Sequence, residues 1–353
     1  MLPLVSIIMP IRNEEIFINK CLSSILSQTY PKEYLEIIIV DGISNDKTRE
    51  IIKSTSSDII NIKLFDNHKM IVPFGFNIGL SESIGDIIIR IDGHCLINDN
   101  YVQNCVDIIE KTGYDCVGGP IENSAKGRIG NLINLAQSSF FGVGGVDFRK
   151  AINTGKFVDT LAFGAYKREV FAKLGGYDEE LKRNQDDEFN FRLIQNGGKI
   201  WLDPLIKSTY YPRTSIIRLF RQYFEYGLYK IRVFQKRKSV ASIRHLVPAC
   251  FVLLILILFL FAYLITGLPL IIFCFIYFIS SLFSSIYEFA FLDAKKEINF
   301  FNLIFITPII FFTLHFSYGL GTIFGLIKFI NKWNESDIID SSFNHEKFIN
   351  RIS

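Results

Sequence analysis

Short apolar runs alternate with amphipathic helical patterns over the first 120 residues. The apolar runs have the length of buried strands, and the segments between them repeat apolar positions at helical spacing. This alternation predicts an α/β domain with a mostly parallel sheet covered by helices on both faces. The predicted strands are 4–9, 35–40, 60–65 and 86–91, and the predicted helices are 16–27, 46–53 and 74–83.

The second half of the chain predicts fewer strands and longer helices. A strand is expected near 157–163, and helices are expected at 167–174, 185–196 and 214–236, the last of them amphipathic. Beyond these, residues 246–287 and 298–327 contain no Asp, Glu, Lys or Arg. About 20 apolar residues cross a bilayer as a helix. We therefore expect about three transmembrane helices, the first two divided at 266–269. The lysines that follow the last apolar run favour the inside, so this run could instead be re-entrant or interfacial. These lysines are Lys328, Lys332 and Lys347.

Composition and charge set the organisation of the chain. Its 353 residues are 49% hydrophobic and 21% charged, which excludes a disordered protein. Residues 207–245 hold ten Lys or Arg and one acid. Basic flanks of membrane helices stay in the cytoplasm, so we expect a multi-pass protein of the cytoplasmic (inner) membrane whose first domain faces the cytoplasm. The predicted regions are an α/β domain at 1–205, a basic interface segment at 206–245, transmembrane helices at 246–330 and a polar tail at 331–353.

Polar side chains follow three of the predicted strands. Because ligands bind at the carboxyl ends of parallel strands, these side chains should lie at one edge of the sheet. They include Glu14, Asp41, Asp92 and His94. Asp41 could accept hydrogen bonds from a nucleobase or ribose, or could belong only to a strand-to-helix turn. Asp92 and His94 could together hold Mg²⁺ or Mn²⁺ with diphosphate oxygens completing the shell, or could form a surface turn.

Two further clusters could carry chemistry. Asp186 begins a run of three acids at a predicted helix start, where the helix dipole favours them and mutual repulsion raises the pKa of at least one toward that of a general base. Arg213, Arg221 and Gln222 lie in a basic and aromatic stripe that could hold a diphosphate, or could only rest on a membrane surface. The adjoining apolar helices exclude nucleic acid as the partner of this stripe.

Taken in order, these motifs resemble those of the family 2 glycosyltransferases, whose catalytic domain has the GT-A fold. Beyond about residue 200, the sequence YPRTSIIRLFRQYFEYG and the membrane helices are similar to the succinoglycan glucosyltransferase subgroup, which extends lipid-linked oligosaccharides. The segments that carry the resemblance are VSIIMPIRNEE (5–15), IIIVDGISNDKT (37–48), IIIRIDGHC (87–95), GGYDEE (175–180) and QDDEF (185–189).

The resemblance implies roles for individual residues. Asp92 corresponds to the first acid of the family's DxD metal motif, His94 stands at the second acid, and Asp186 corresponds to the general base. Gln185 replaces the Glu that precedes this base. The QxxRW signature of processive synthases is absent, which favours addition of one sugar per binding event. The residues that resemble those lining the nucleotide pocket are Pro10, Glu14 and Asp41.

These implications define one expected function and two alternatives. The expected function is an inverting, metal-dependent transfer of a sugar from a nucleotide diphosphate sugar, UDP-linked, to a hydroxyl of a polyprenyl-diphosphate-linked glycan in cell-surface polysaccharide synthesis. A polyprenyl-phosphate sugar synthase would instead use the lipid phosphate as nucleophile and would need no base. A non-catalytic scaffold with a degenerate transferase domain is permitted by His94 and Gln185. The expected function requires Asp41, Asp92, His94 and Asp186 to meet at one site.

Overall fold

The chain forms two compact units in the computed structural model. The first unit contains 1–122, 151–210 and 337–353, and the second contains 123–150 and 211–336. The chain leaves and re-enters the first unit, so these units differ from regions divided by composition alone. The structure describes residues 2–55, 61–124, 127–149, 152–211, 215–240, 242–290, 298–335, 339 and 341–350.

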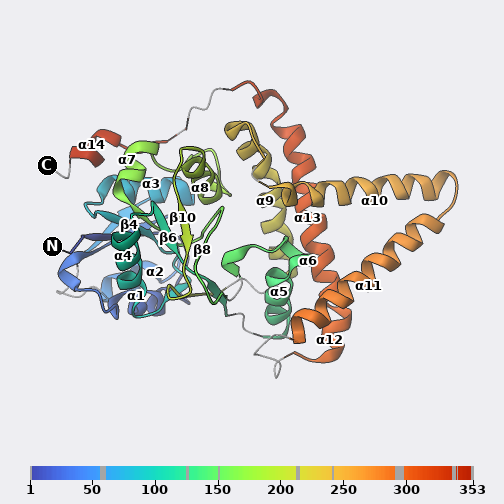
Figure 1. Cartoon of the computed structure of the whole chain (residues 1–353), viewed down its shortest axis with the longest axis horizontal. Coiled ribbons are helices and arrows are strands. Elements are labelled where there is room, and N and C mark those ends of the chain that lie inside the picture. The colour runs from blue at the N-terminus through green and yellow to red at the C-terminus, as the bar shows by residue number, and fades with distance from the viewer. Residues whose placement is uncertain are drawn as a thin grey trace. The chain divides into compact units, whose positions relative to one another are not determined.

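An eight-stranded sheet forms the centre of the first unit (Figure 1). Its strand order is β3-β2-β1-β4-β9-β6-β10-β8. The first four strands in this order are parallel, as predicted, whereas β9 runs antiparallel to both β4 and β6. Strand β10 is parallel to β6 and antiparallel to β8. The strands are β1 (Val5–Ile11), β2 (Leu35–Asp41), β3 (Asn61–Asp66), β4 (Ile87–Arg90), β6 (Cys116–Gly118), β8 (Lys156–Phe157), β9 (Ala165–Lys167) and β10 (Ile200–Leu202).

A second sheet has the order β5-β11-β7, and its first strand follows β4 in the chain. Its strands are β5 (Cys95–Ile97), β11 (Ser208–Tyr210) and β7 (Ile121–Asn123). Strands β5 and β11 are antiparallel, and Tyr210 pairs with Cys95. This pairing places an aromatic side chain beside the segment that follows β4.

Helices cover the sheet because its central strands are apolar on both faces. Every residue of β1 and β2 is buried. The predicted helices of this unit are confirmed to within about two residues at each end. The helices are α1 (Ile18–Leu26), α2 (Thr48–Thr55), α3 (Val72–Glu82), α4 (Tyr101–Thr112), α7 (Arg168–Leu174), α8 (Gln185–Gln195) and α14 (His345–Asn350).

The strand predicted at 157–163 is wrong. Only Lys156–Phe157 pairs, as β8, and the next strand begins at Ala165. Between them, Asn190 Nδ2 donates hydrogen bonds to Thr160 Oγ1 and to the carbonyl of Leu161, each at 3.0 Å. A side chain of α8 therefore holds this segment, which the apolar pattern alone predicts to be a strand.

The second unit is helical. Among the described residues, three helical segments are long and apolar enough to cross a membrane, namely Ile243–Leu264, Leu268–Ala290 and Phe300–Lys328. The predicted division at 266–269 is confirmed, because α10 ends at Leu264 and α11 begins at Leu268. The helices are α5 (Arg128–Ser138), α6 (Phe140–Val143), α9 (Ile216–Arg237), α10 (Val247–Leu264), α11 (Leu268–Ala290), α12 (Phe300–Phe305) and α13 (Thr307–Lys328).

Candidate active site

Asp41, the last residue of β2, is fully buried and bound by its neighbours. The Ser44 amide donates to Asp41 Oδ2 at 3.0 Å, and the Ser44 hydroxyl donates to Oδ1. Arg49 from α2 donates to Asp41 Oδ2 at 2.8 Å and to Asp66 Oδ1 at 2.6 Å. One guanidinium thus links the carboxylates at the ends of two adjacent strands, which fixes the edge of the sheet.

The loops after β1 and β2 are joined by hydrogen bonds between backbone and side chains. The Asn13 amide donates to Ser44 Oγ at 2.8 Å, and the Asn45 amide donates to Asn13 Oδ1 at 3.0 Å. The Glu14 amide donates to Thr48 Oγ1 at 2.8 Å. Glu14 is therefore held beside the Asp41 loop, as expected for residues at the carboxyl ends of neighbouring parallel strands.

Glu14 also reaches the segment that follows β4. His94 Nδ1 lies 2.9 Å from Glu14 Oε1, and the His94 ring lies 4.8 Å from the ring of Tyr210. Pro10, by contrast, is buried inside β1, in register with Val40. From this position, Pro10 can affect the conformation of the carboxyl end of β1 through buried packing.

Arg90 joins the two acids on which the expected chemistry depends. Its Nε and Nη2 donate to Asp92 Oδ1 at 3.1 and 2.8 Å, and its Nη1 lies 3.7 Å from Asp186 Oδ2. Its guanidinium lies 6.0 Å from the ring centre of Tyr177. Burial disfavours the Arg90 charge, but Asp92, Tyr177 and Asp186 more than offset this, so the pKa of Arg90 is raised.

The sequence patterns above did not predict a role for Arg90, although its position in the sequence indicates one. It ends the run Ile87-Ile88-Ile89, where every position is buried. An arginine at the end of a buried strand needs acidic partners, because a buried charge is costly when unpaired. Asp92 is the acid nearest to Arg90 in the sequence.

Asp186 lies in the first turn of α8 with its side chain one-third exposed. Burial raises the pKa of this carboxyl, the charge of Arg90 partly opposes that effect, and the charge of Asp187 adds to it. The Asp187 amide donates to Asp186 Oδ1 at 2.9 Å. A carboxyl whose pKa is raised and that retains contact with solvent is suited to accept a proton.

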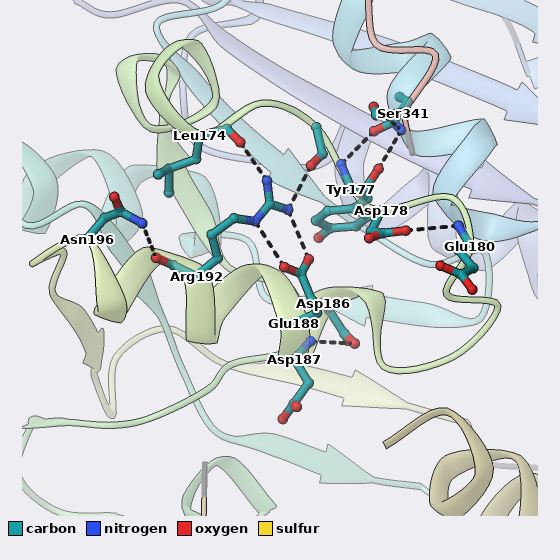
Figure 2. A network of polar contacts seen from close by, with 12 residues as sticks. Leu174, Tyr177, Asp178, Glu180, Asp186, Asp187, Glu188, Arg192, Asn196 and Ser341 are labelled. Carbon is teal, nitrogen blue, oxygen red and sulfur yellow. Dashed lines mark hydrogen bonds and ion pairs between the residues drawn. The ribbon is translucent and has the colours of Figure 1, made fainter. Parts of the chain in front are cut away.

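Glu188, the third acid of the cluster, belongs to a buried ion pair that stabilises the fold (Figure 2). It is fully buried and pairs with Arg192, Nη2 to Oε2 at 2.9 Å. Arg192 also donates to the carbonyls of Leu174 and Gly176 at 2.6 and 2.9 Å. These bonds tie α8 to the segment that follows α7 and so fix the helix start that carries Asp186.

Contacts link most candidate residues of the first unit into two groups. One chain of contacts runs from Asp41 through the joined loops to Glu14 and His94, and another runs from Asp92 through Arg90 to Asp186. Arg221 and Gln222 belong to α9 of the second unit, where Arg221 is exposed and Gln222 Nε2 donates to Tyr226 Oη at 2.8 Å. Arg213 lies outside the described residues.

Asp92 and His94 offer one carboxylate and one imidazole, which are donor types that a cation shared with substrate phosphates could use. No group of three or more His, Cys, Asp or Glu side chains within the described ranges could hold a metal ion without help. Both Arg90 hydrogen bonds go to Asp92 Oδ1, which leaves Oδ2 for a ligand. Mg²⁺ is usually bound by one or two carboxylates together with water and substrate phosphates, and Mn²⁺ also accepts imidazole.

Comparisons with known proteins identify the family. A family model described as glycosyl transferase family 2 matches residues 6–175. The chain is 32% identical over 272 residues to the dolichyl N-acetyl-alpha-D-glucosaminyl phosphate 3-beta-D-2,3-diacetamido-2,3-dideoxy-beta-D-glucuronosyltransferase of Methanococcus voltae, covering 75% of this chain and 82% of that protein. The chain belongs to glycosyltransferase family 2.

Other similarities agree with this assignment. The glycosyltransferase is 30% identical over 244 residues to the succinoglycan biosynthesis protein ExoA of Rhizobium meliloti, covering 69% of this chain and 73% of that protein. Among solved structures, the mannosyltransferase PcManGT of Pyrobaculum calidifontis matches with a TM-score of 0.57 at 18% identity, covering 93% of this chain and 88% of that one. The predicted GT-A fold and transferase activity are therefore confirmed.

Proposed function

We propose that this glycosyltransferase is inverting and moves a sugar from a UDP-linked donor to a hydroxyl of a polyprenyl-diphosphate-linked glycan. The observation that carries the proposal is the contact of Arg90 with both Asp92 and Asp186. Asp92 is the acid proposed for the diphosphate end of the donor, and Asp186 is the base proposed for the acceptor. Their contacts with one guanidinium support a role for both carboxylates at one reacting centre.

The donor's nucleotide is assigned to the edge formed by Pro10, Glu14 and Asp41. Three hydrogen bonds already occupy the Asp41 oxygens. A carboxylate has about four lone-pair positions, so about one remains for a ribose or base donor. The ion pair with Arg49, whose side chain is about one-third exposed, holds the Asp41 carboxylate in place.

Asp92 and His94 are the residues proposed to hold a divalent cation, Mn²⁺ or Mg²⁺. When bound, such a cation neutralises charge on the departing diphosphate. The solved mannosyltransferase with the same fold is described as a complex with GDP-mannose and Mn²⁺. Glu14 orients the His94 ring through its Nδ1 atom, so the ring position does not depend on a ligand.

Asp186 is the proposed general base. It takes the proton of the acceptor hydroxyl, whose oxygen forms a bond to the anomeric carbon as the bond from that carbon to the diphosphate oxygen breaks. The nucleotide diphosphate leaves with the electron pair, and the configuration at the anomeric carbon is inverted. A positioned base contributes roughly 10²–10⁴ in rate.

The lipid-linked acceptor is supported by the relatives and by the chain itself. The Methanococcus voltae enzyme is named for transfer to a sugar on dolichyl phosphate, and ExoA is named for succinoglycan biosynthesis. This chain has a basic segment followed by helices apolar enough to enter a membrane. These features suit a catalytic domain on the cytoplasmic side of the inner membrane, in contact with membrane lipids. Arg213, Arg221 and Gln222 are proposed to contact the acceptor's phosphates.

An acceptor comparison tests the proposal. Membranes that contain the full chain would be supplied with a radiolabelled UDP-sugar, Mn²⁺, and either a glycosylated polyprenyl diphosphate or bare polyprenyl phosphate. We expect label only in the glycosylated lipid. Label in bare polyprenyl phosphate would instead support a polyprenyl-phosphate sugar synthase, and failure to bind any nucleotide would support a non-catalytic scaffold.

A further inference from the structure

The tail of the chain returns to the first unit and is anchored there by Phe348. This side chain is fully buried. The Arg168 guanidinium lies 3.6 Å from the centre of the Phe348 ring, and Arg168 Nη2 donates to the Phe348 carbonyl. Arg168 begins α7 of the catalytic domain, so the tail is held by a buried cation–π contact and a hydrogen bond together.

Further contacts spread this attachment over α3 and its surroundings. Asn77 Nδ2 donates to Ser341 Oγ at 3.0 Å, and the Asn344 amide donates to Ser81 Oγ at 3.1 Å. Lys347 forms an ion pair with Glu82. Figure 1 shows α14 beside α7 and α3. The tail residues 341–350 therefore belong to the same folded body as the catalytic strands and must share their side of a membrane.

Helices α9 and α13 pack side by side in the second unit and run in the same direction (Figure 1). Leu219 shares a buried cluster with Phe311 near the start of both helices, and Gln235 Nε2 donates to the Phe329 carbonyl at 2.8 Å near their ends. Between these contacts the backbones approach closely. A Cβ at Gly227 would lie 2.0 Å from the carbonyl oxygen of Tyr318.

This parallel packing places α9 and α13 at the same depth along their length. Between Leu219 and Gln235, α9 carries four charged residues. Charged side chains at the centre of a bilayer are strongly unfavourable. Lys230 and Arg232 are buried within the unit, but Arg221 is exposed and Glu225 is half-buried. These two charges disfavour a place for α9 in the hydrocarbon layer, and the packing extends this to its neighbour α13. The charged residues are Arg221, Glu225, Lys230 and Arg232.

The number of buried residues also distinguishes α13 from the other two apolar helices. Eleven residues of α13 are buried, against two in α10 and two in α11. At about 1.5 Å per residue, α10 and α11 are roughly 27 and 34 Å long, close to the roughly 30 Å of a hydrocarbon core. Only 265–267 separates them, so they form a hairpin (Figure 1). The exposed side chains of this hairpin are largely apolar.

We propose that the α10–α11 hairpin is the element inserted into the membrane, while α9 and α13 lie together at its surface. The chain then enters and leaves the bilayer on the catalytic side, and the tail returns to the catalytic domain without a third crossing. Exposed apolar residues on α13, such as Phe324 and Ile327, suit an interfacial position. This topology replaces the three crossings expected from composition, and it does not depend on the sugar transferred.

Single cysteines would test this topology in the full chain. Cys250 and Cys274 are exposed and would be changed to alanine, whereas the other four cysteines are buried. Glu33→Cys then marks the catalytic domain, Glu346→Cys marks the tail and Thr266→Cys marks the hairpin tip, all at exposed positions. Sealed membrane vesicles of each orientation would be treated with a membrane-impermeant maleimide, and detergent-solubilised protein would show that each introduced cysteine can react.

We expect the Glu33→Cys and Glu346→Cys variants to be labelled in the same vesicles, and the Thr266→Cys variant not to be labelled in those vesicles. Labelling of the catalytic-domain and tail variants from opposite sides would overturn the proposal, because the chain would then cross an odd number of times. Labelling of the hairpin-tip variant from the catalytic side would also overturn it, because the hairpin would not be inserted. None of these results requires enzyme activity, so they are independent of the proposed function.

Discussion

Removal of the Arg90 charge should change the pH dependence of catalysis. Its Nη1 atom lies 3.7 Å from Asp186 Oδ2. At about 4 Å, two unit charges attract by about 1 kcal/mol in water and about 4 kcal/mol at an effective dielectric constant of 20. Because the Asp186 side chain is one-third exposed, the lower part of this range applies. A loss of about 1.4 kcal/mol lowers the ionised fraction of a carboxylate about tenfold at pH values below its pKa.

The direction of the pH shift follows from the role of Asp186 as the base. Asp186 must be ionised to accept a proton, and Arg90 lowers the pKa that burial has raised. In Arg90→Met, the pKa of Asp186 rises further, so the acidic limb of the kcat profile moves to higher pH. At pH values on that limb, kcat falls about tenfold or more, and part of the loss is recovered in more alkaline buffer. Arg90→Lys is the matched control, because it keeps the charge but lacks the paired Nε and Nη2 donors that contact Asp92.

The assay is sugar transfer to the glycosylated lipid across a pH series. A variant that lost activity only through local unfolding would lower kcat equally at every pH. An Arg90→Met profile that parallels the wild-type profile, with no shift of its acidic limb, would refute the reasoning.

Three further predictions concern the scaffold and the donor. Glu188→Ala leaves Arg192 buried without its carboxylate, so the free energy of unfolding should fall by about 3–5 kcal/mol, and an unchanged thermal midpoint would contradict this. Arg49→Met removes the cation that fixes Asp41, so KM for the donor should rise more than kcat falls, whereas a pure loss of kcat would exclude a donor-binding role. Phe348→Ala should cost about 3–5 kcal/mol at the tail contact and expose residues 341–350 to limited proteolysis, and unchanged protection would contradict the anchoring.

Local patterns predicted the elements that build the sheet edge. The apolar runs ending at Asp41 and before Asp92 are continuous, so their strands could be placed to within about two residues. The strand expected at 157–163 failed for a tertiary reason, since Asn190 holds that segment by hydrogen bonds. Hydrophobic periodicity contains no information about such a contact.

The roles within the site were only partly visible in the sequence. Asp186, Asp187 and Glu188 have the same chemistry and adjacent positions, but a helical spacing of four pairs Glu188 with Arg192 and marks it as structural. The tail contacts could not be predicted, because Phe348 and Arg168 are 180 residues apart and neither belongs to a motif. The packing of α9 on α13 could not be predicted either. This packing determines whether α13 is interpreted as a membrane-spanning or an interfacial helix.

The most direct test of the central claim compares Asp186→Asn with Asp187→Asn, a matched change one residue along the same helix. Transfer of radiolabelled sugar to the glycosylated lipid would be measured together with nucleotide binding. We expect Asp186→Asn to lower kcat by roughly 10²–10⁴ while donor binding is retained, and Asp187→Asn to keep most of its activity. Wild-type turnover in Asp186→Asn would exclude Asp186 as the general base.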